Sequence, residues 1–547
     1  MRNENHSFVP RLVEQYEKQE ISRREFLRTA TLLGMSAASA YSIVGGSDPA
    51  LAQTDIPTGG TAKLAYPVYD VTRPQSGATV ELSNLTFPVV QTLTRIGTDN
   101  ICRPLVCESW KVSDDLKSWT FQLRKNAKWR KGRPFIADDV VANFKRLLDP
   151  ANGSGSLSVM RSYLLKEAEK DGKKTTELWD ANAIEKVDDH TVRFNLRIPQ
   201  VALPEHFTQY TSVMVDPEEG GILKPGANGT GPFELVEMEV QRRAVYKKSS
   251  NYWGRPAYLD QVEFIHAGDD ENAMLTMLAS KQVDGVKGLP IELLNRAKDM
   301  PHVNVYSSVT AFTATLALDT TVKPWDDVRV RHALRLAVDT QKQVALALRG
   351  AGKAGEHHHV CPVHPDYAPL PPMPQDVAKA KALLAEAGYA NGFNFECLVP
   401  ANPSWEVASL EGMAEDFRAL GVTMKINVVP RPRYLDVWDK MPAIYTDWAH
   451  RPLGIQMLGL AYRSSAPWNI SKWKNKEFDE MMDKADATVD PVERRKYVGR
   501  CEELLRTEGP MLQPLWVNVQ TAYDKRVKGF QIHPTRVVHI EDIGISS

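Results

Sequence analysis

Apolar and polar residues alternate in the first half of the chain, and this period of two constrains the fold most strongly. In residues 118–124 large apolar side chains alternate with polar ones, which is typical of a strand with one buried face. Residues 108–112 precede it across a polar turn at 113–117, so the two segments predict a β-hairpin. A second hairpin is predicted from residues 184–196. The chain must therefore contain an antiparallel sheet with one face packed on a core.

Helical patterns follow these hairpins. Residues 137–147 predict a helix with Asp138 as its N-cap, because an acidic group is favourable at the positive end of the helix dipole. Another helix is predicted at 80–93, after a first strand at 63–68.

From about residue 310 helices and strands alternate. Residues 377–387 and 393–399 predict one helix–strand unit, and residues 409–419 and 423–428 predict another. The tail predicts strands at 515–522 and 527–532. Such a mixture is typical of an α/β protein, and 547 residues exceed what one compact core supports.

The charge balance restricts the partners. Lys and Arg together number 67 against 68 for Asp and Glu, so no net field attracts nucleic acid or anionic lipid. The five cysteines include no C-x-x-C pair, which argues against a zinc ribbon or a redox motif. Cys102 and Cys107 form one local disulfide in an oxidising compartment, or all five are buried thiols.

The first 52 residues are typical of an export signal. Arg23 and Arg24 precede a modest apolar run rich in Ala, Ser and Gly, and residues 50–52 read Ala-Leu-Ala. This pattern resembles a twin-arginine (Tat) signal with cleavage after Ala52. The apolar run is shorter than the roughly 20 residues that span a bilayer. We therefore expect a periplasmic protein that uses the Tat export machinery.

A family resemblance emerges from motifs spread along the mature chain. They read ESWKVSDDLKSWTFQLRKNAKWRKGRPFIADDVVANFKRLLDP, NGTGPFELVE, NYWGRPAYLDQVEF and KPWDDVRVRHALRLAVD. In series and in this order they resemble the dipeptide/oligopeptide/nickel-type extracellular solute-binding proteins of family 5. Their side chains are interpreted as scaffold: aromatic core packing, a glycine turn, and capping or ion pairing by Asp326, Asp327, Arg329 and Arg331.

The resemblance implies a bilobal periplasmic-binding-protein fold of type II, of the large peptide-binding-protein kind. Lobe I would span residues 53–309 with an extra hairpin-rich subdomain at roughly 80–230, lobe II residues 310–510, and residues 511–547 would return to lobe I. The lobes would close on the ligand by a rigid-body swing.

The function implied is that of the substrate-binding component of an ABC importer. It would act as a monomer, without a cofactor, and deliver a peptide or another small polar or anionic solute to a membrane permease and its ATPase. A nickel-type protein for a metal or metal chelate is the alternative on this scaffold, and a chemosensory or chaperone-like role also stays open. A secreted Tat-dependent enzyme is disfavoured because G-x-S-x-G, H-E-x-x-H, P-loop and Rossmann patterns are absent.

The ligand contacts are predicted mainly in the segment YTDWAHRPLG at 445–454. Dipeptide-binding relatives carry an aspartate-rich stretch near this position, and this chain departs from that pattern. Asp447 would bind an amine, Arg451 a carboxylate or other anion, and Trp448 would stack on a planar group. Further candidate ligand contacts are Tyr66, Trp405 and Trp516.

A histidine tract at His357, His358 and His359 raises a metal interpretation. Neutral imidazoles suit nickel, copper or zinc. Adjacent side chains on an extended segment point in different directions, however, so the three cannot easily converge on one ion.

Overall fold

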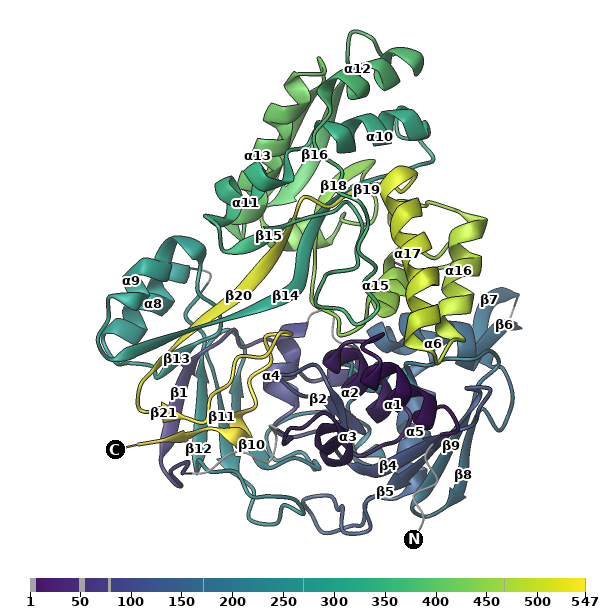
Figure 1. Ribbon diagram of the computed structural model, residues 1–547. Helices are drawn as coiled ribbons and strands as arrows, with labels where there is room; N and C mark the ends of the chain where they lie inside the picture. Colours follow the sequence, from purple (N-terminus) through teal and green to yellow (C-terminus); the bar gives the residue numbers. More distant parts are fainter. Residues whose placement is uncertain are drawn as a thin grey trace. The chain divides into compact units, whose positions relative to one another are not determined.

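The computed structural model describes residues 6–48, 55–76, 80–170, 172–268, 270–466 and 468–546 (Figure 1). The chain forms two compact units. The first contains Met1–Ser308 and Gln520–Ser547, and the second contains Val309–Val519. Strands β14 (Val303–Leu318) and β20 (Leu515–Asp524) belong partly to each unit.

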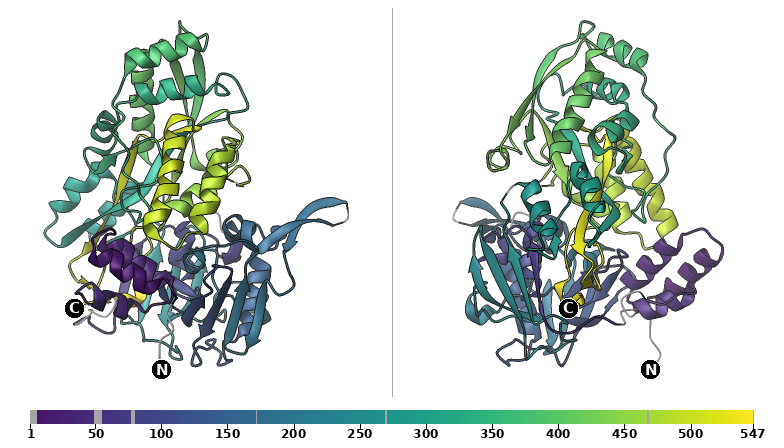
Figure 2. Two further views of the ribbon diagram at one scale, coloured as in Figure 1. Left: turned by 45° about the vertical axis from the view of Figure 1, so that its right-hand side comes forward. Right: turned by 90° about the vertical axis from the view of Figure 1, so that its left-hand side faces the viewer.

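The first unit begins with helices that precede its first strand (Figure 2). They are α1 (Val9–Glu17), α2 (Arg23–Leu32) and α3 (Ala37–Ile43). A capping box starts α2: the Ser22 hydroxyl accepts from the Glu25 N–H, and the Glu25 carboxylate accepts from the Ser22 N–H. The predicted cleavage point after Ala52 lies outside the described residues.

Both predicted hairpins are confirmed and belong to one antiparallel sheet. Its order is β4 (Cys107–Val112), β5 (Ser118–Leu123), β9 (Thr191–Asn195) and β8 (Ile184–Asp188). Trp119 and Phe121 are fully buried and pack in the same core as Trp110 and Trp129. Helix α5 (Ala137–Leu147) lies against β8 and β9.

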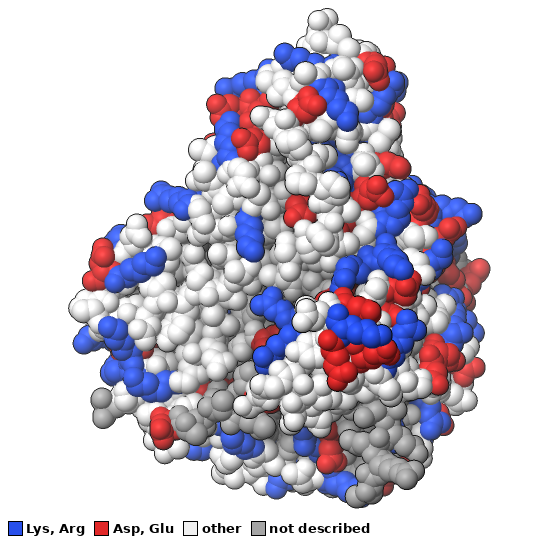
Figure 3. Space-filling model, in the orientation of Figure 1, with Lys and Arg blue, Asp and Glu red and all other residues white. Residues whose placement is uncertain are grey.

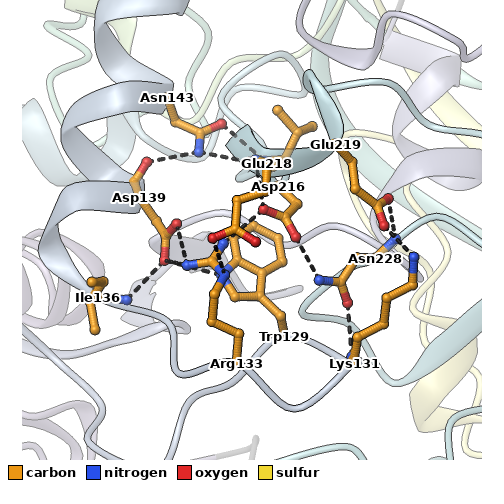
Figure 4. A network of polar contacts seen from close by, with 11 residues as sticks. Trp129, Lys131, Arg133, Ile136, Asp139, Asn143, Asp216, Glu218, Glu219 and Asn228 are labelled. Atoms are coloured by element: carbon orange, nitrogen blue, oxygen red, sulfur yellow. Dashed lines mark hydrogen bonds and ion pairs between the residues drawn. The ribbon is translucent and has the colours of Figure 1, made fainter.

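A polar network joins this region to the rest of the first unit (Figure 4). Asp139 accepts hydrogen bonds from the Ile136 backbone N–H and from Nε1 of Trp129, each at 3.0 Å. Arg133 donates to Asp139 at 2.9 Å and to Asp216 at 2.7 Å. These motif side chains therefore hold the scaffold together, as the sequence predicted.

The prediction of Asp138 as the N-cap of α5 is wrong, because the N-cap is Ile136 and Asp138 is the second helical residue. Asp139 receives the N-cap N–H, whereas Asp138 is exposed and pairs with Lys186 at 2.7 Å. The capping carboxylate must reach back over one turn, and a side chain at the third helical position does so.

A second strand set in the first unit combines parallel and antiparallel pairs. Its order is β10 (Phe233–Glu239), β11 (Arg243–Lys248), β12 (Gln261–Ile265), β1 (Thr61–Ala65), β13 (Gly285–Val286) and then β20. Strand β1 is parallel to β12 and β13, and β13 is antiparallel to β20.

Shorter elements complete the first unit. The helices are α4 (Ser83–Thr86), α6 (Gly155–Leu164), α7 (Leu203–His206), α8 (Glu271–Ala279) and α9 (Leu294–Lys298). The 3-10 turns are Pro74–Ser76, Val80–Leu82, Pro150–Asn152, Pro217–Glu219, Ile291–Leu293 and Ile540–Asp542. The strands are β2 (Thr94–Ile96), β3 (Cys102–Pro104), β6 (Leu165–Lys170), β7 (Lys173–Leu178), β21 (Val527–Lys528) and β22 (Gly544–Ile545).

Two predicted elements are wrong in extent. The helix expected at 80–93 ends at Thr86, because Pro88 supplies no N–H to continue it. The strand expected at 527–532 is reduced to Val527–Lys528, which pairs with β22.

The second unit contains a mixed β-sheet with parallel and antiparallel strand pairs. Its order is β20, β14, β18 (Ala443–Trp448), β16 (Asn394–Pro400) and β17 (Thr423–Val429), while β15 (Gly352–Ala354) pairs with β20 and β19 (Met511–Leu512) with β14. Strand β18 is antiparallel to β14, and β16 is parallel to β17 and β18.

The helices of the second unit are α10 (Val328–Ala337), α11 (Thr340–Leu348), α12 (Val377–Glu386), α13 (Ser404–Arg418), α14 (Arg431–Leu435), α15 (Gly454–Ala461), α16 (Lys476–Asp486) and α17 (Pro491–Thr507). They include α10, α11, α13 and α14, which contact strands of the unit, and α12 and α16, which pack on α10 and α17, respectively. The two predicted helix–strand units are confirmed.

The arginine-rich motif of α10 caps another helix. Asp327 accepts from the Arg329 N–H at 2.8 Å and is the N-cap of α10, in agreement with the capping role expected of this motif. Arg331 donates to the Glu508 carbonyl at 2.6 Å, and Arg335 donates to the Thr507 carbonyl at 2.8 Å. These carbonyls follow or end α17, where backbone acceptors lack helical partners. Arg331 therefore bonds to backbone oxygens, while the expected ion pair is formed by Arg329 and Asp327 at 2.6 Å.

Three whole-chain expectations can be compared with the structure. All five cysteines are free and buried, so Cys102 and Cys107 form no disulfide. Acidic and basic side chains are interspersed over the visible face in Figure 3. Within the described residues, no helix combines the length and apolarity that crossing a membrane requires.

Candidate functional site

The segment predicted to bind the ligand lies at the end of β18. Asp447 and Trp448 are its last two residues, so their side chains leave opposite faces of the strand. The structure therefore does not bring them together on one surface. Each belongs to a different cluster within the second unit.

Asp447 is paired with a cation of its own unit. Arg431, the first residue of α14, donates to Asp447 at 2.8 Å and lies 4.0 Å from the buried carboxylate of Glu406. Burial opposes the charge of Arg431, but Asp447 and Glu406 outweigh it and raise the pKa of the guanidinium. The predicted amine-binding carboxylate is thus already compensated by an arginine.

Trp448 belongs to an aromatic group that we call the His359 cluster, made of His359, Trp448, Tyr462 and Trp516. The His359 ring centroid lies 5.7 Å from that of Trp448, 5.8 Å from Tyr462 and 6.0 Å from Trp516. All four side chains are buried. Two predicted ligand contacts, Trp448 and Trp516, are therefore neighbours through a histidine considered from sequence only as a metal ligand.

The hydrogen bonds of the His359 cluster are incomplete. Nε1 of Trp448 donates to the Thr315 hydroxyl at 3.2 Å, and the Tyr462 hydroxyl shares a 2.8 Å hydrogen bond with Nδ1 of His359. Nε1 of Trp516 and Nε2 of His359 are buried without a hydrogen-bond partner in the described part of the chain. A buried polar group left unpaired costs about 1–3 kcal/mol.

His359 is held neutral. Burial is the main cause that lowers its pKa well below the ordinary value, and nearby His364, His358 and Arg451 lower it further. Whichever ring nitrogen carries the proton, Nε2 keeps one hydrogen-bonding position. The cluster therefore offers an indole N–H and an imidazole nitrogen beside aromatic faces.

Arg451 follows β18 and is close enough to His359 for its charge to lower the pKa of that imidazole. Its guanidinium donates to the Ala449 and His450 carbonyls at 3.4 and 3.3 Å. Its own carbonyl accepts from Nε2 of His364 at 3.0 Å, while Nδ1 of His364 accepts from the Cys361 N–H. These bonds fix the His364 tautomer and anchor the turn that carries Arg451.

The other predicted contacts lie elsewhere. Tyr66 is buried in the first unit, where its hydroxyl bonds to that of Tyr523 at 2.8 Å. Trp405 packs edge-on against Phe312 in the second unit, with ring centroids 5.7 Å apart. Both are packing contacts in this structure.

The histidine tract does not converge. Nδ1 of His357 accepts from the Gln513 N–H at 3.2 Å, His358 contacts Glu356 at 2.8 Å, and His359 contacts Tyr462. Among the residues that the structure describes, the ligand-type group with closely spaced donor atoms is His539, Glu541 and Asp542 in the first unit. Arg95 and Arg255 pair with Glu541 and Asp542, respectively.

Sequence reasoning missed Arg431 as the partner of Asp447, and Thr315 and Tyr462 as partners of the aromatic cluster. The partner residues are 16, 133 and 103 positions away. The sequence could have predicted that Asp447 and Trp448 lie on opposite faces, because successive side chains of a strand alternate and only the strand assignment is needed.

Comparison with known proteins places the chain among binding proteins. A family model described as bacterial extracellular solute-binding proteins, family 5 Middle, matches residues 102–469. The dipeptide-binding protein DppE of Bacillus subtilis is 26% identical over 475 residues, covering 83% of this chain and 86% of that protein. Heme-binding protein A of Haemophilus influenzae is 28% identical over 471 residues, covering 79% and 82%.

A solved structure shows the same fold. The periplasmic binding protein DppA from Helicobacter pylori, in complex with the peptide STSA, superposes with a TM-score of 0.76 at 21% identity, covering 90% of this chain and 99% of that one. This likeness confirms the predicted α/β fold of the large peptide-binding type.

Proposed function

Because the chain belongs to the bacterial extracellular solute-binding proteins of family 5, we propose that it captures a peptide or another small polar solute for a membrane permease. It is a substrate-binding component of an ABC importer, and its relatives are binding proteins rather than enzymes. The names of those relatives include a dipeptide-binding and a heme-binding protein, so the ligand must be inferred from the site.

The compartment and domain roles are part of this proposal. The twin arginines at Arg23 and Arg24 support export by the Tat pathway with cleavage after Ala52, which would release a monomeric protein into the periplasm. The two compact units support an assignment of lobes, with β14 and β20 as the chain segments shared by both. A permease with its ATPase would then receive the solute.

The observation that carries the ligand proposal is the pair of unsatisfied groups in the His359 cluster. Nε1 of Trp516 and Nε2 of His359 are buried without partners in the described residues, and buried polar groups in folded proteins are nearly always bonded. A solute that accepts from the Trp516 N–H and hydrogen-bonds to Nε2 of His359 would satisfy both groups, and its planar or apolar part would stack on Trp448.

Arg451 and Asp447 take different roles in this proposal. Arg451, near His359, would favour a carboxylate or another anion on the solute. Asp447 is paired with Arg431, and an ammonium group of the solute would have to compete with that pair. We therefore assign the solute a hydrogen-bond acceptor and an anionic group before an amine.

Native mass spectrometry of the freshly purified protein would first identify the retained solute. Calorimetry with that solute then compares wild type with Trp516→Phe, which removes the unpaired N–H, and with Arg451→Ala. The matched control is Trp473→Phe, at another buried indole of the same unit outside the cluster. We expect Trp516→Phe to raise Kd about fivefold to tenfold, as one hydrogen bond of about 1 kcal/mol would.

The expected result for Arg451→Ala is a loss of at least about tenfold for an anionic solute, since bonds to charged groups are worth about 1.5–3 kcal/mol. Wild-type affinity in both Trp516→Phe and Arg451→Ala would contradict the contact assignment. Conversion of the bound solute into a product would contradict the binding function itself.

A further inference from the structure

Within the first unit, the N-terminal segment at residues 6–48 is docked on the rest of the unit through buried contacts. Nε of Arg28 donates to a carboxylate oxygen of Glu205 at 2.7 Å, and the two side chains are 4% and 0% exposed. Nε1 of Trp110 donates to the Leu32 carbonyl at 2.9 Å. Helix α2 also contacts β3. This pair joins α2 to α7, which carries Glu205, at a buried position where either charge without the other would be costly.

Both ends of the segment are anchored as well. The Ser7 hydroxyl donates to Asp114 at 2.7 Å. Near the other end, Arg103 donates to Asp48 at 2.6 Å. Between them the Tyr41 hydroxyl donates to Asp99 at 2.5 Å. The anchoring residues of the unit lie on the turns and strands from β2 to β5.

The two parts of the export signal differ in their exposure to solvent. Arg23 and Arg24 are exposed. The apolar residues that follow, including Phe26, Leu27 and Ala30, are at most 3% exposed. The arginine pair therefore faces solvent while the apolar run is covered.

We propose that the rest of the folded first unit is a receptor for the chain's own residues 6–48. The surface formed by β3, Trp110 and Glu205 covers the apolar run of the export signal and leaves the arginine pair accessible. Trp110, on β4, and Glu205, on α7, are far apart in sequence, so this surface forms only when the unit has folded. Only the folded precursor therefore covers the apolar run of its signal and protects it from aggregation. Removal of residues 6–48 would expose the surface formed by β3, Trp110 and Glu205.

This proposal is independent of the solute that the protein binds, because its contacts all lie in the first unit. It also differs from the Tat assignment, since docking would hold for any export route.

Gly34 and Gly45 provide a matched pair of variants. A Cβ at Gly34 would lie 2.6 Å from the Trp110 carbonyl oxygen, whereas a Cβ at Gly45 meets nothing within 4 Å. Both glycines have positive φ, +92° and +67°, so Gly34→Ala and Gly45→Ala introduce backbone strain of the same kind. The contact with the first unit distinguishes them.

The test is hydrogen exchange on the full chain, purified from the cytosol of a host without the twin-arginine machinery. We expect α2 amides to be protected in wild type and to exchange at least tenfold faster in Gly34→Ala than in Gly45→Ala. Exchange of the β4–β5 amides reports whether the unit stays folded. Unprotected α2 amides in wild type, or equal α2 exchange in the two variants, would overturn the proposal.

A second pair of variants tests the ion pair between Arg28 and Glu205. Both substitutions lie within residues 6–48, so the residues of the rest of the unit are unchanged. Arg28→Gln removes the partner of Glu205, and Arg11→Gln makes the same change at an exposed arginine of α1. We expect at least tenfold faster α2 exchange in Arg28→Gln and wild-type exchange in Arg11→Gln. Wild-type protection in Arg28→Gln would refute the role of the pair in docking.

Discussion

The two indoles of the His359 cluster allow the unsatisfied donor to be tested without knowing the solute. Trp448 and Trp516 are 6% and 1% exposed, and both contact the His359 ring. Nε1 of Trp448 donates to Thr315, whereas Nε1 of Trp516 has no acceptor in the described chain. Substitution of either indole by phenylalanine removes the same atoms, so a comparison of the two isolates the state of the N–H group.

The expected difference follows from three contributions. Loss of ring volume from a buried site costs about 2–3 kcal/mol of unfolding free energy in both variants. Trp448→Phe also loses a formed hydrogen bond, worth about 1 kcal/mol. Trp516→Phe instead removes a buried unpaired donor, which returns about 1–3 kcal/mol. We therefore expect a loss of about 3–4 kcal/mol for Trp448→Phe, and for Trp516→Phe a change between a gain of about 1 kcal/mol and a loss of about 2 kcal/mol.

The assay is equilibrium urea unfolding of solute-free protein, prepared by gel filtration in guanidinium and refolding. The near-ultraviolet circular dichroism of the aromatic side chains follows the transition, and equal slopes against urea show that the same surface unfolds. The reasoning is refuted if Trp516→Phe destabilises the protein as much as Trp448→Phe. In that case the Trp516 N–H has a partner in the free protein, and the ligand proposal loses its main support.

Three further outcomes follow from the structure. We expect Arg335→Met to lower the unfolding free energy by about 1–3 kcal/mol in urea, because the Thr507 carbonyl at the end of α17 loses its donor, although the Gly509 carbonyl keeps Arg331. Arg329→Met, at an exposed site, should change it by less than about 0.5 kcal/mol. Asp139→Ala should cost about 3 kcal/mol or more, because three donors lose their acceptor, and Asp138→Ala should cost under about 0.5 kcal/mol; equal losses would contradict the capping assignment. Burial lowers the pKa of His206 from 6.5 to about 3, so the unfolded chain binds the extra proton and stability, full above pH 6.5, falls as the pH drops toward 3. His206→Gln should reduce that slope by up to about 1.4 kcal/mol per pH unit in urea titrations at pH 7 and pH 5, and an unchanged slope would contradict it.

Local sequence pattern predicted the elements whose stabilising contacts are close in sequence. The alternation of Trp119, Phe121 and Leu123 led directly to β5, whose three large side chains are at most 1% exposed. The helix–strand units around β16 and β17 followed from their periodicity in the same way. The helix predicted at 80–93 is wrong in extent because Pro88, which has no backbone N–H, outweighs the apolar pattern of this segment.

The site could be predicted only in part, for a different reason. Trp448 and Trp516 were identified as aromatic candidates, but their common neighbour His359 comes from a loop 89 positions before Trp448 in the sequence. Pairing of Asp447 with Arg431 depends on α14 and β18 being neighbours, which the pattern of either segment does not reveal. Contacts of this kind, between segments distant in sequence, determine whether a carboxylate such as that of Asp447 can bind a solute.

Unsatisfied donors in a binding protein link stability to ligand capture. A group such as the Trp516 N–H lowers the stability of the free protein, and a solute that accepts its hydrogen bond removes that loss on binding. Saturation at about 100 times Kd adds roughly 2.7 kcal/mol to the unfolding free energy. Trp516→Phe weakens binding, so at one fixed solute concentration it should gain less stability from the solute than wild type does, by about 1 kcal/mol. The same side chain would thus make the free protein less stable and the loaded protein more stable, which is the behaviour expected of a ligand contact and not of a packing residue.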